Sequence, residues 1–509
     1  MQPHPLELPE VLALIGTFLL WVEEPQYHQP THRLDPKAIS ACLRVSKLWY
    51  KTLLPVLWHI FSSQTSMHCI PPAVIRRDSH FCRILEVPSY SPDKVDLSLF
   101  TCTHLLEATL FHAECRQGAG NDTSGRGREE REVDGQQPQQ QLMKALSPGQ
   151  RLLRSNPRLR ILDWSGAGIP SPPLDVDDFA GLKELHTLSL LGWDCSNGQL
   201  RRLLKIVAGS LKELKLDWIK GVQPEELSTA LSPSKEGEDT GVADGNDAGW
   251  ALSQLEVLEW FNLHSDGSCL TSLVKRCPNL KSFKLRLDLD ETNATRLANS
   301  LWTHCPNLEA LIVTTMSPVP YLQPLIRCGP TPSVLRKLRI TSQGPDCGLI
   351  AAILHHASTL EDISIVREHG TRMDAIGYCR LLFECPRLTY FSLYTQRSNF
   401  NQDFMDALKE QHWACRGLQE LRFSIATSDE DRRLKEEREI MEDDSDVLRK
   451  MGWEYANSNE LRQDESSARQ VLSAKLWRAL EMVQSQGLEQ LCLLQLDSVN
   501  YRRISSTPS

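Results

Sequence analysis

The sequence contains no Cys-x-x-Cys pair. Its 15 cysteines are only about 3% of 509 residues, far below the density of a disulfide scaffold. Because their number is also odd, we interpret them as reduced, mostly buried thiols. This interpretation excludes a disulfide-rich secreted domain and predicts a protein of the cytoplasm, the nucleus or both.

The sequence also lacks a run long enough to span a membrane. Its most apolar stretch, residues 11–22, is far shorter than the ~20 residues that a bilayer requires. Glu7, Pro9 and Glu10 stand where a signal peptide has basic residues, and no small-residue cleavage site follows. A net charge of −9 provides no general basic surface. We therefore expect neither a nucleic-acid nor a membrane partner.

Motifs that carry enzyme chemistry are missing as well. The glycine-rich string at residues 118–127 is not followed by Gly-Lys-Ser/Thr, so it does not predict a phosphate-binding loop. No hydrolase, metalloprotease or kinase motif occurs. Cys102, His104, His112 and Cys115 do not predict a zinc site, because a strand between the histidines would hold them roughly 26 Å apart. We predict no catalytic residue, no metal and no cofactor, and a protein that is not an enzyme.

Three short apolar segments are present near the start of the chain. Pro9 suits the first turn of a helix, and Leu12 and Ile15 follow at helical spacing. Asp35 and Pro36 suit the N-cap and first position of a second helix. The second and third segments carry Ile39, Cys42, Leu43, Val45, Leu53, Leu54, Val56, Leu57 and Trp58. Such a small core leaves apolar surface that a partner, or only the rest of the chain, would cover.

These segments resemble the F-box motif, a three-helix module that binds the small linker subunit of a cullin–RING ubiquitin ligase. The resemblance is carried by Leu8-Pro9-Glu10, by residues 43–49 (LRVSKLW) and by Leu57-Trp58, in this order. It implies docking to the linker subunit, and through it to the cullin, by Leu8, Pro9, Leu12, Ile15, Ile39, Leu43, Val45, Trp49, Leu57 and Trp58. The spacer at residues 21–34 exceeds the family's usual length by about a dozen residues, which a loop tolerates at little cost.

A second pattern, L-x-x-L-x-L, recurs from residue 159 onward. Uninterrupted copies begin 25 to 30 residues apart, which is typical of leucine-rich repeats. One strand–helix unit cannot bury its own apolar face, so neighbouring units must stack. The copies begin at Leu159, Leu185, Leu211, Leu255, Leu280, Leu308, Leu335, Leu360, Leu388 and Leu418, with a terminal copy Leu488-x-x-Leu491-x-Leu493 and weaker candidates at residues 82–87 and 105–110.

Helix-compatible segments, such as residues 199–207, 292–304 and 401–415, lie between the predicted strands. Cys277-Pro278, Cys305-Pro306 and Cys385-Pro386 recur before three of these strands. In each pair the cysteine should end the helix inside the core, and the proline should stop the helix. These motifs resemble the cysteine-containing repeats of F-box leucine-rich proteins. The predicted fold class is α/β: a three-helix F-box-like module followed by a leucine-rich-repeat solenoid, with parallel strands on its concave face and helices on its convex face.

The predicted organisation has four parts. Residues 1–62 form the F-box-like domain, and residues 63–115 form a connecting segment with one or two degenerate repeats. Residues 116–146 form a polar insertion that we expect to be disordered. Residues 147–500 form the repeat array, with loop insertions at about 232–250 and 427–487. We interpret the insertions as surface loops, and a functional role for them stays open.

The concave face is the expected binding surface, because the side chains between the leucines point away from the core. The candidate target-binding residues are Phe261, Lys284, Arg286, Lys337, Arg339, Tyr390, Tyr394 and Arg422. Acidic Asp163, Glu213, Asp217 and Glu259 lie mostly in the earlier repeats. One hypothesis is that the later repeats favour an acidic or phosphorylated partner segment; the alternative is an ordinary surface of mixed charge.

The resemblance implies a non-catalytic substrate-recognition adaptor of an F-box-containing cullin–RING ubiquitin ligase. The helices would dock the linker subunit, and the array would bind an unknown target protein for ubiquitination and proteasomal degradation. The alternative is a leucine-rich-repeat interaction scaffold that is not assembled into a ligase. An enzyme would instead need a pocket of perturbed titratable groups.

Overall fold

A computed structural model describes most of the repeats and part of the N-terminal module. Contacts divide the chain into two compact units, Met1–Val222 and Gln223–Ser509, and each is described by itself. The described residues are 8–20, 22–23, 32–33, 40–62, 70–87, 96–111, 148–166, 175–219, 221, 250–261, 268–286, 290–318, 322–327, 334–343, 348–367, 375–395, 408, 412–423, 453–455, 493–496 and 499–503.

The first unit begins with helices α1 (Pro9–Leu20) and α3 (Lys47–Leu57), which pack on each other. Residues 40–42 are helical, and the chain then turns over residues 43–45. The sequence predicted a second helix that included Leu43 and Val45, but both residues lie in this turn. The cause is Ser46, which is the N-cap of α3 and whose Oγ accepts a backbone N–H of the first turn at 3.2 Å.

The helical module has a small core that continues into the repeats. Leu53 is fully buried, and Gly16 allows α1 to approach it: a Cβ at residue 16 would lie 2.6 Å from Leu53 Cδ2. Below α3, Trp58 stacks on Phe61 with ring centroids 6.0 Å apart. Phe61 meets the edge of Phe100 at 4.9 Å. The module therefore also covers the first end of the repeat core.

The lengthened spacer after α1 folds back on itself. Strand β1 (Val22–Glu23) pairs antiparallel with β2 (His32–Arg33), so the two ends of the extra segment lie together. The insertion therefore begins and ends at neighbouring positions, as expected for a loop insertion that the fold tolerates. Residues 24–31, between the two strands, lie outside the described residues.

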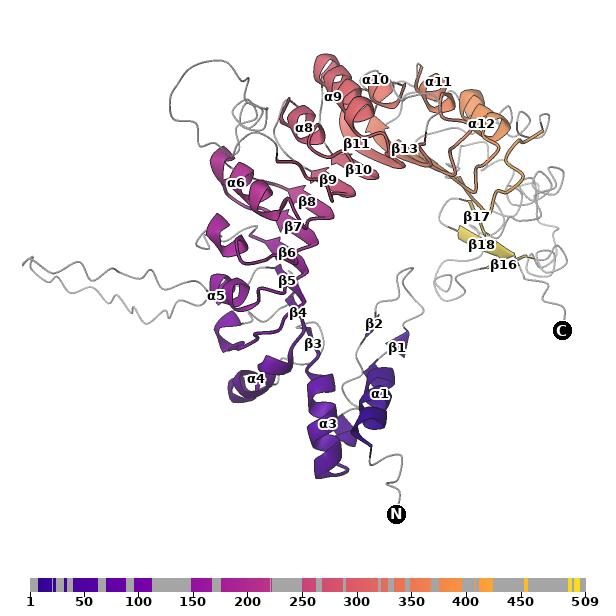
Figure 1. The fold of residues 1–509 in the computed structure, drawn as a ribbon. Coiled ribbons are helices and arrows are strands. Elements are labelled where there is room, and N and C mark those ends of the chain that lie inside the picture. The colour runs from indigo at the N-terminus through magenta and orange to yellow at the C-terminus, as the bar shows by residue number, and fades with distance from the viewer. Residues whose placement is uncertain are drawn as a thin grey trace, which may run out of the picture. The chain divides into compact units, whose positions relative to one another are not determined.

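The rest of the first unit is a stack of strand–helix repeats. Six strands pair in parallel in chain order: β3 (Ile60–Ser62), β4 (Ile84–Val87), β5 (Glu107–Phe111), β6 (Ile161–Ser165), β7 (Thr187–Leu191) and β8 (Glu213–Asp217). Between them lie helices α4 (Pro72–Asp78), α5 (Pro148–Ser155) and α6 (Asn197–Val207), and 3-10 turns η3 (Ser79–Phe81), η4 (Leu97–Leu99) and η5 (Val176–Phe179). The weaker copy at residues 82–87 thus contains β4, and the one at residues 105–110 contains all of β5 except Phe111. Helices α4–α6 lie on one side of the strands (Figure 1).

The second unit repeats this arrangement. Its parallel strands are β9 (Val257–Phe261), β10 (Ser282–Arg286), β11 (Ala310–Pro318), β12 (Lys337–Gln343), β13 (Asp362–Arg367), β14 (Tyr390–Thr395) and β15 (Glu420–Phe423). The helices are α8 (Ser268–Val274), α9 (Glu291–His304), α10 (Leu322–Arg327), α11 (Leu349–Leu354) and α12 (Ala375–Glu384). The helices again lie on one side of the strands (Figure 1). The predicted α/β leucine-rich-repeat solenoid is confirmed.

The C-terminal repeat differs from the prediction in its register. Strand β17 (Leu493–Leu496) pairs in parallel with β15, and Leu494 lies opposite Leu421. The terminal copy is therefore Leu491-x-x-Leu494-x-Leu496, and the predicted copy beginning at Leu488 was three residues too early. Strand β18 (Val499–Arg503) then pairs antiparallel with β17, and β16 (Trp453–Tyr455) with β18. The repeat pattern of the sequence does not predict these two antiparallel strands.

The three predicted insertions lie almost entirely outside the described residues. Residues 116–146 are outside them, and so are residues 232–249 and residues 427–487 apart from β16. The predicted helix at residues 401–415 is described only at residue 408 and from residue 412. The order and role of the insertions stay predictions.

Side chains at the helix ends form a ladder of hydrogen bonds from one repeat to the next. Cys305 ends α9 as predicted, and its Sγ donates to the Cys277 carbonyl at 3.3 Å. Burial raises the pKa of Cys305 to about 12, so the thiol keeps its proton and acts as a donor. In the first unit, Cys102 Sγ donates to the Ser79 carbonyl at 3.1 Å, and Asn156 Nδ2 to the Cys102 carbonyl at 3.0 Å. These side chains satisfy buried carbonyls between repeats.

His356 occupies the core of the second unit. It is fully buried and stacks on Trp302 with ring centroids 5.6 Å apart. Its Nε2 lies 2.6 Å from the Ile326 carbonyl, which requires the proton on Nε2. Burial is the main cause that lowers the pKa of His356 below 6.5, and the neighbouring His355 lowers it further.

We expect the stability of the second unit to fall as pH drops through 6.5. The unfolded chain takes up a proton on His356 at higher pH than the folded chain, so acid favours unfolding. A His356→Gln variant loses this contribution, which is at most about 1.4 kcal/mol per pH unit. Urea unfolding at several pH values between 5 and 7.5 measures it. Parallel stability profiles of the variant and the native chain would contradict the expectation.

Candidate interaction surfaces

The predicted docking residues of the helical module have different environments. Leu12 is fully buried and Trp58 is 4% exposed, so both hold the module together and do not offer surface to a partner. Pro9 and Val45 are exposed. The half-buried residues are Leu8, Ile15, Leu43, Trp49 and Leu57. Ile39 lies outside the described residues.

Three exposed apolar side chains of the module were missed by the sequence prediction. Leu14, Leu48 and Tyr50 are 58%, 37% and 40% exposed, and Val45 is 62% exposed. A motif of apolar positions cannot separate the residues that pack inside a three-helix unit from those that face outward. The orientation of α1 against α3 decides this, and the close approach at Gly16 sets that orientation.

The repeats present an open face, which we define as the strand side chains that alternate with the buried ones and point away from the helices. In the first unit the described open face is acidic. Its charged side chains are Glu86, Glu107, Asp163, Glu213 and Asp217, against Lys215. Burial, followed by the nearby Glu86, raises the pKa of Glu107, and burial raises the pKa of Asp163. The acidic side chains therefore gather in the earlier repeats.

The open face of the second unit carries more cations than carboxylates. Among its described strand residues, Lys284, Arg286, Lys337, Arg339 and Arg422 stand against Glu259, Asp362 and Glu420. Lys284 pairs with Glu259, whose side chain is only 8% exposed. Arg286 has no charge partner among the described residues. The face is therefore of mixed charge with a positive excess, and a preference of the later repeats for an acidic partner segment stays a prediction.

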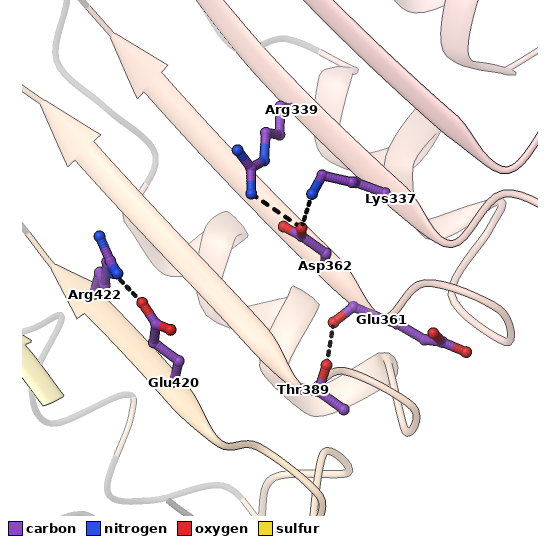
Figure 2. Close-up of polar contacts among 7 residues, drawn as sticks. All are labelled: Lys337, Arg339, Glu361, Asp362, Thr389, Glu420 and Arg422. Atoms are coloured by element: carbon purple, nitrogen blue, oxygen red, sulfur yellow. Dashed lines mark hydrogen bonds and ion pairs between the residues drawn. The ribbon is translucent and has the colours of Figure 1, made fainter. Parts of the chain in front are cut away.

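Strands β12 to β15 carry a group of ion-paired side chains on this face (Figure 2). Lys337 Nζ and Arg339 Nη2 lie 2.8 and 3.2 Å from the same oxygen, Asp362 Oδ2. Two strands further, Arg422 pairs with Glu420 through Nε. Asp362 and Glu420 were not part of the predicted site. Asp362 pairs with two residues of the neighbouring strand, and Glu420 pairs with a residue two positions later, so neither pairing is visible in the sequence pattern.

Tyr390 lies between the two arginines. The guanidinium carbon of Arg339 is 5.8 Å from the Tyr390 ring centroid, and that of Arg422 is 5.5 Å from it. Both distances are within the range of cation–π attraction. Three predicted residues, Arg339, Tyr390 and Arg422, are thus brought together. Of the other predicted aromatics, Phe261 is the last residue of β9, and Tyr394 precedes the last residue of β14 and is 43% exposed.

The strands of this group are held in register at their starting edge. Thr389 Oγ1 donates to the Glu361 carbonyl at 3.0 Å (Figure 2). The backbone N–H groups of Thr389 and Tyr390 donate to the same oxygen at 2.8 and 3.0 Å. Such contacts fix β13 against β14. The side chains of the open face therefore stand on a rigid base.

Comparison with known proteins found no matching family model and no matching curated protein. Among solved structures, an internalin from Listeria monocytogenes matches with a TM-score of 0.30 and 15% identity, over 54% of this chain and 70% of that chain. A structure of the Rad7–Elc1 complex in yeast matches with a TM-score of 0.31 and 16% identity, over 55% of this chain and 73% of that chain. The fold assignment rests on the strands and helices described above.

The described residues hold no cluster of three or more His, Cys, Asp or Glu side chains that would suit a metal ion. Cys102 and His104 are among them, whereas His112 and Cys115 lie outside. The ten described cysteines are all free thiols. No helix within the described ranges is long and apolar enough to cross a membrane.

Proposed function

We propose that this chain is a non-catalytic substrate adaptor of a cullin–RING ubiquitin ligase. In this proposal the N-terminal helices dock on the linker subunit, and the open face of the repeats holds a target protein. Tethering the target beside the conjugating machinery raises its effective concentration, so the adaptor itself needs no catalytic group.

The observation that supports the proposal is the concentration of exposed large apolar side chains in the N-terminal helical module. Seven large apolar side chains are exposed among the described residues: Leu14, Val45, Leu48, Tyr50, Trp218, Val334 and Tyr394. Four of these seven belong to the small helical module. Burying such side chains against a partner is favourable, and exposed apolar patches mark interaction sites. The F-box resemblance of the same segment supports a linker subunit as that partner.

A second candidate function is an interaction scaffold in which the helices only cap the repeats. The stack of Trp58, Phe61 and Phe100 favours it, because these rings cover the first strand of the array. A cap, however, does not require exposed Val45 and Leu48. The two candidates therefore differ in what these two side chains do.

The test is copurification of the full chain with a linker subunit of cullin–RING ligases. We expect a stable complex with the native chain. The double substitution Val45→Glu, Leu48→Glu should weaken it by on the order of a hundredfold, because each change removes an apolar contact and buries a charge at the interface. Isothermal titration measures the affinity.

Val334→Glu is the matched control. Val334 is 39% exposed, close to the 37% of Leu48, but it lies in the repeats. This variant should bind the linker subunit as the native chain does. A native chain that forms no complex would overturn the adaptor proposal in favour of the scaffold. Equal losses in the control and the double variant would show that the contact is not at the helical module.

A further inference from the structure

The acidic side chains on the open face of the first unit stand on strands that pair side by side, β4 to β8. Lys215 is the single cation among the described strand side chains of this face, and it already pairs with Glu213 at 3.1 Å. The carboxylates of the face belong to Glu86, Glu107, Asp163, Glu213 and Asp217. The face therefore has a negative excess that its own described side chains do not neutralise.

Glu107 has the most apolar surroundings of these carboxylates. The strand register places it between Ile84 and Ile161, and all three side chains are half-buried. Burial, followed by the like charge of Glu86, raises the pKa of Glu107. Neither Glu86 nor Glu107 has an ion-pair partner among the described residues. A lysine or arginine would suit this place, because its methylene groups would cover the two isoleucines while its cation meets the carboxylate.

Ser165 gives a second and independent observation on the same face. Its neighbour Trp164 lies against Gly149 of helix α5, so Ser165 points to the opposite side of the sheet, as Asp163 does. The Ser165 side chain is 5% exposed, and its Oγ has no hydrogen-bond partner among the described residues. A buried hydroxyl without a partner is unfavourable, and a donor that a bound segment brings would satisfy it.

Trp218 stands at the β8 end of the acidic face. It directly follows Asp217, is 50% exposed and has a φ of 53°, which a bulky side chain rarely adopts. An indole ring attracts a cation to its face more strongly than the other aromatic side chains do. An exposed indole beside a carboxylate therefore also suits a lysine or arginine.

The spacing of these groups selects the kind of ligand. The acidic strands β4, β6 and β8 are each two strands apart, which is about 10 Å, so one ion cannot contact the carboxylates of two of them. The five strands together span ~19 Å, which is the length of about six residues of extended chain. A peptide segment with several cations matches this spacing, and its side chains also match the half-buried isoleucines.

We propose that the open face of strands β4 to β8 binds an extended segment of the target protein that is rich in lysine and arginine. This inference rests on the proposed function, because it names the class of target that the adaptor holds. One cation of the segment lies on Ile84 and Ile161 and pairs with Glu107, and another stacks on Trp218. A donor of the segment between these two cations satisfies the Ser165 hydroxyl.

Peptide libraries test the site without knowledge of the target. Immobilised full-length chain is equilibrated with fluorescent peptides of random sequence that carry lysine or arginine at alternate positions. Matched libraries carry glutamine at the same positions. We expect the basic library to be retained about tenfold more than the glutamine library. Glu107→Gln should reduce this retention about tenfold, and Trp218→Gly about fivefold.

Neither variant should lower the temperature of thermal unfolding. Glu107→Gln removes a half-buried charge, and glycine adopts the positive φ of residue 218 without strain. A loss of retention in these variants therefore reports the surface and not the fold. Glu184→Gln is the matched control, because it removes the same charge in the first unit but lies outside the strands, where Glu184 pairs with Arg160. This control should retain the basic library as the native chain does.

Three results would overturn the inference. The first is equal retention of the basic and glutamine libraries by the native chain. The second is an equal loss in Glu107→Gln and Glu184→Gln, because retention would then reflect only the net charge. The third is a chain that retains no basic peptide but self-associates in sedimentation, with Glu107→Gln abolishing the association. The face would then bind a second copy of this chain.

The same preparations separate this inference from the adaptor proposal. If the linker subunit binds but the basic library is not preferred, the basic-segment site fails and the adaptor stands. If retention of the basic library depends on Glu107 and Trp218 while no linker subunit binds, the site stands and the adaptor fails. The docking helices and the acidic face are distinct sets of residues, so each can be changed alone.

Discussion

Replacing Asn156 with alanine should lower the free energy of unfolding of the first unit by about 4 kcal/mol. The side chain is 1% exposed and makes three hydrogen bonds to the backbone. Its Oδ1 accepts from Leu105 N at 2.7 Å, and its Nδ2 donates to the carbonyls of Leu152 and Cys102 at 2.7 and 3.0 Å. Alanine leaves all three backbone groups buried without a partner, and each such group costs roughly 1–3 kcal/mol.

Hydrogen exchange over β5 and β6 measures this loss, because Asn156 connects these two repeats. Asn156→Asp has nearly the same volume, but it turns an oxygen toward two carbonyls. The Asn156→Asp variant should therefore also lower the free energy of unfolding. If Asn156 only filled space, this variant would be as stable as the native chain. Asn279→Ala is the control: Asn279 is exposed and makes one bond, to the Ser253 carbonyl at 2.8 Å, so its loss should cost less than about 1 kcal/mol. Equal losses of stability in the Asn156→Ala and Asn279→Ala variants would contradict a stabilising role for the hydrogen bonds between repeats.

Asn156 also shows why the repeats can be predicted from the sequence, whereas some of the hydrogen bonds that stabilise them cannot. Stacking forces the leucines of each repeat into one core, and every predicted first leucine from Leu159 to Leu418 is buried. Asn156 precedes Pro157 in the way that Cys277 precedes Pro278. A polar residue at this position would be taken for surface, because two of its three partners, Leu105 and Cys102, are backbone groups of the preceding repeat. Such long-range contacts leave no local pattern.

Register was predictable only where one leucine pattern fits. The segment at residues 488–496 (LEQLCLLQL) admits two copies of the repeat, and pairing of Leu494 with Leu421 selects the later one. The two antiparallel strands at this end follow a change of direction that the repeat period does not encode. They cover the last parallel strand and leave no long unpaired edge beside it.

The candidate sites were predictable in part for a similar reason. Alternation along a strand identifies which residues face outward, and this placed Arg339, Tyr390 and Arg422 correctly on the open face. Which outward residues meet across strands depends on register, so Asp362 and Glu420 were missed. In the helical module the periodicity found the apolar residues, but it could not assign Leu12 to the core and Leu48 to the surface.

Replacing Gly16 with leucine should open the helical module while the repeats stay folded. A Cβ at this position would already lie 2.6 Å from Leu53 Cδ2 and 3.3 Å from Val56 Cγ1. Leu53 is fully buried and cannot move aside without displacing Leu43, Trp49 and its other neighbours. Overpacking of this kind costs about 1–3 kcal/mol. Helices of 12 and 11 residues are only marginally stable without each other, so this cost should separate α1 from α3.

Hydrogen exchange of α1 and α3 should then approach that of an unfolded chain, with β5 to β8 unchanged, and the linker subunit should no longer bind. The double substitution of Val45 and Leu48 should also weaken binding, by on the order of a hundredfold, but with both helices still protected from exchange. Hydrogen exchange therefore separates the loss of a surface from the loss of the fold. Gly198→Leu in α6 is the matched control, because the nearest atom to a Cβ there is Ser196 Oγ at 4.0 Å. A helical glycine with free space should accept leucine without loss, and even gain helix propensity. Protected helices in the Gly16→Leu variant would show that the approach of α1 to α3 is not what holds the docking surface in place.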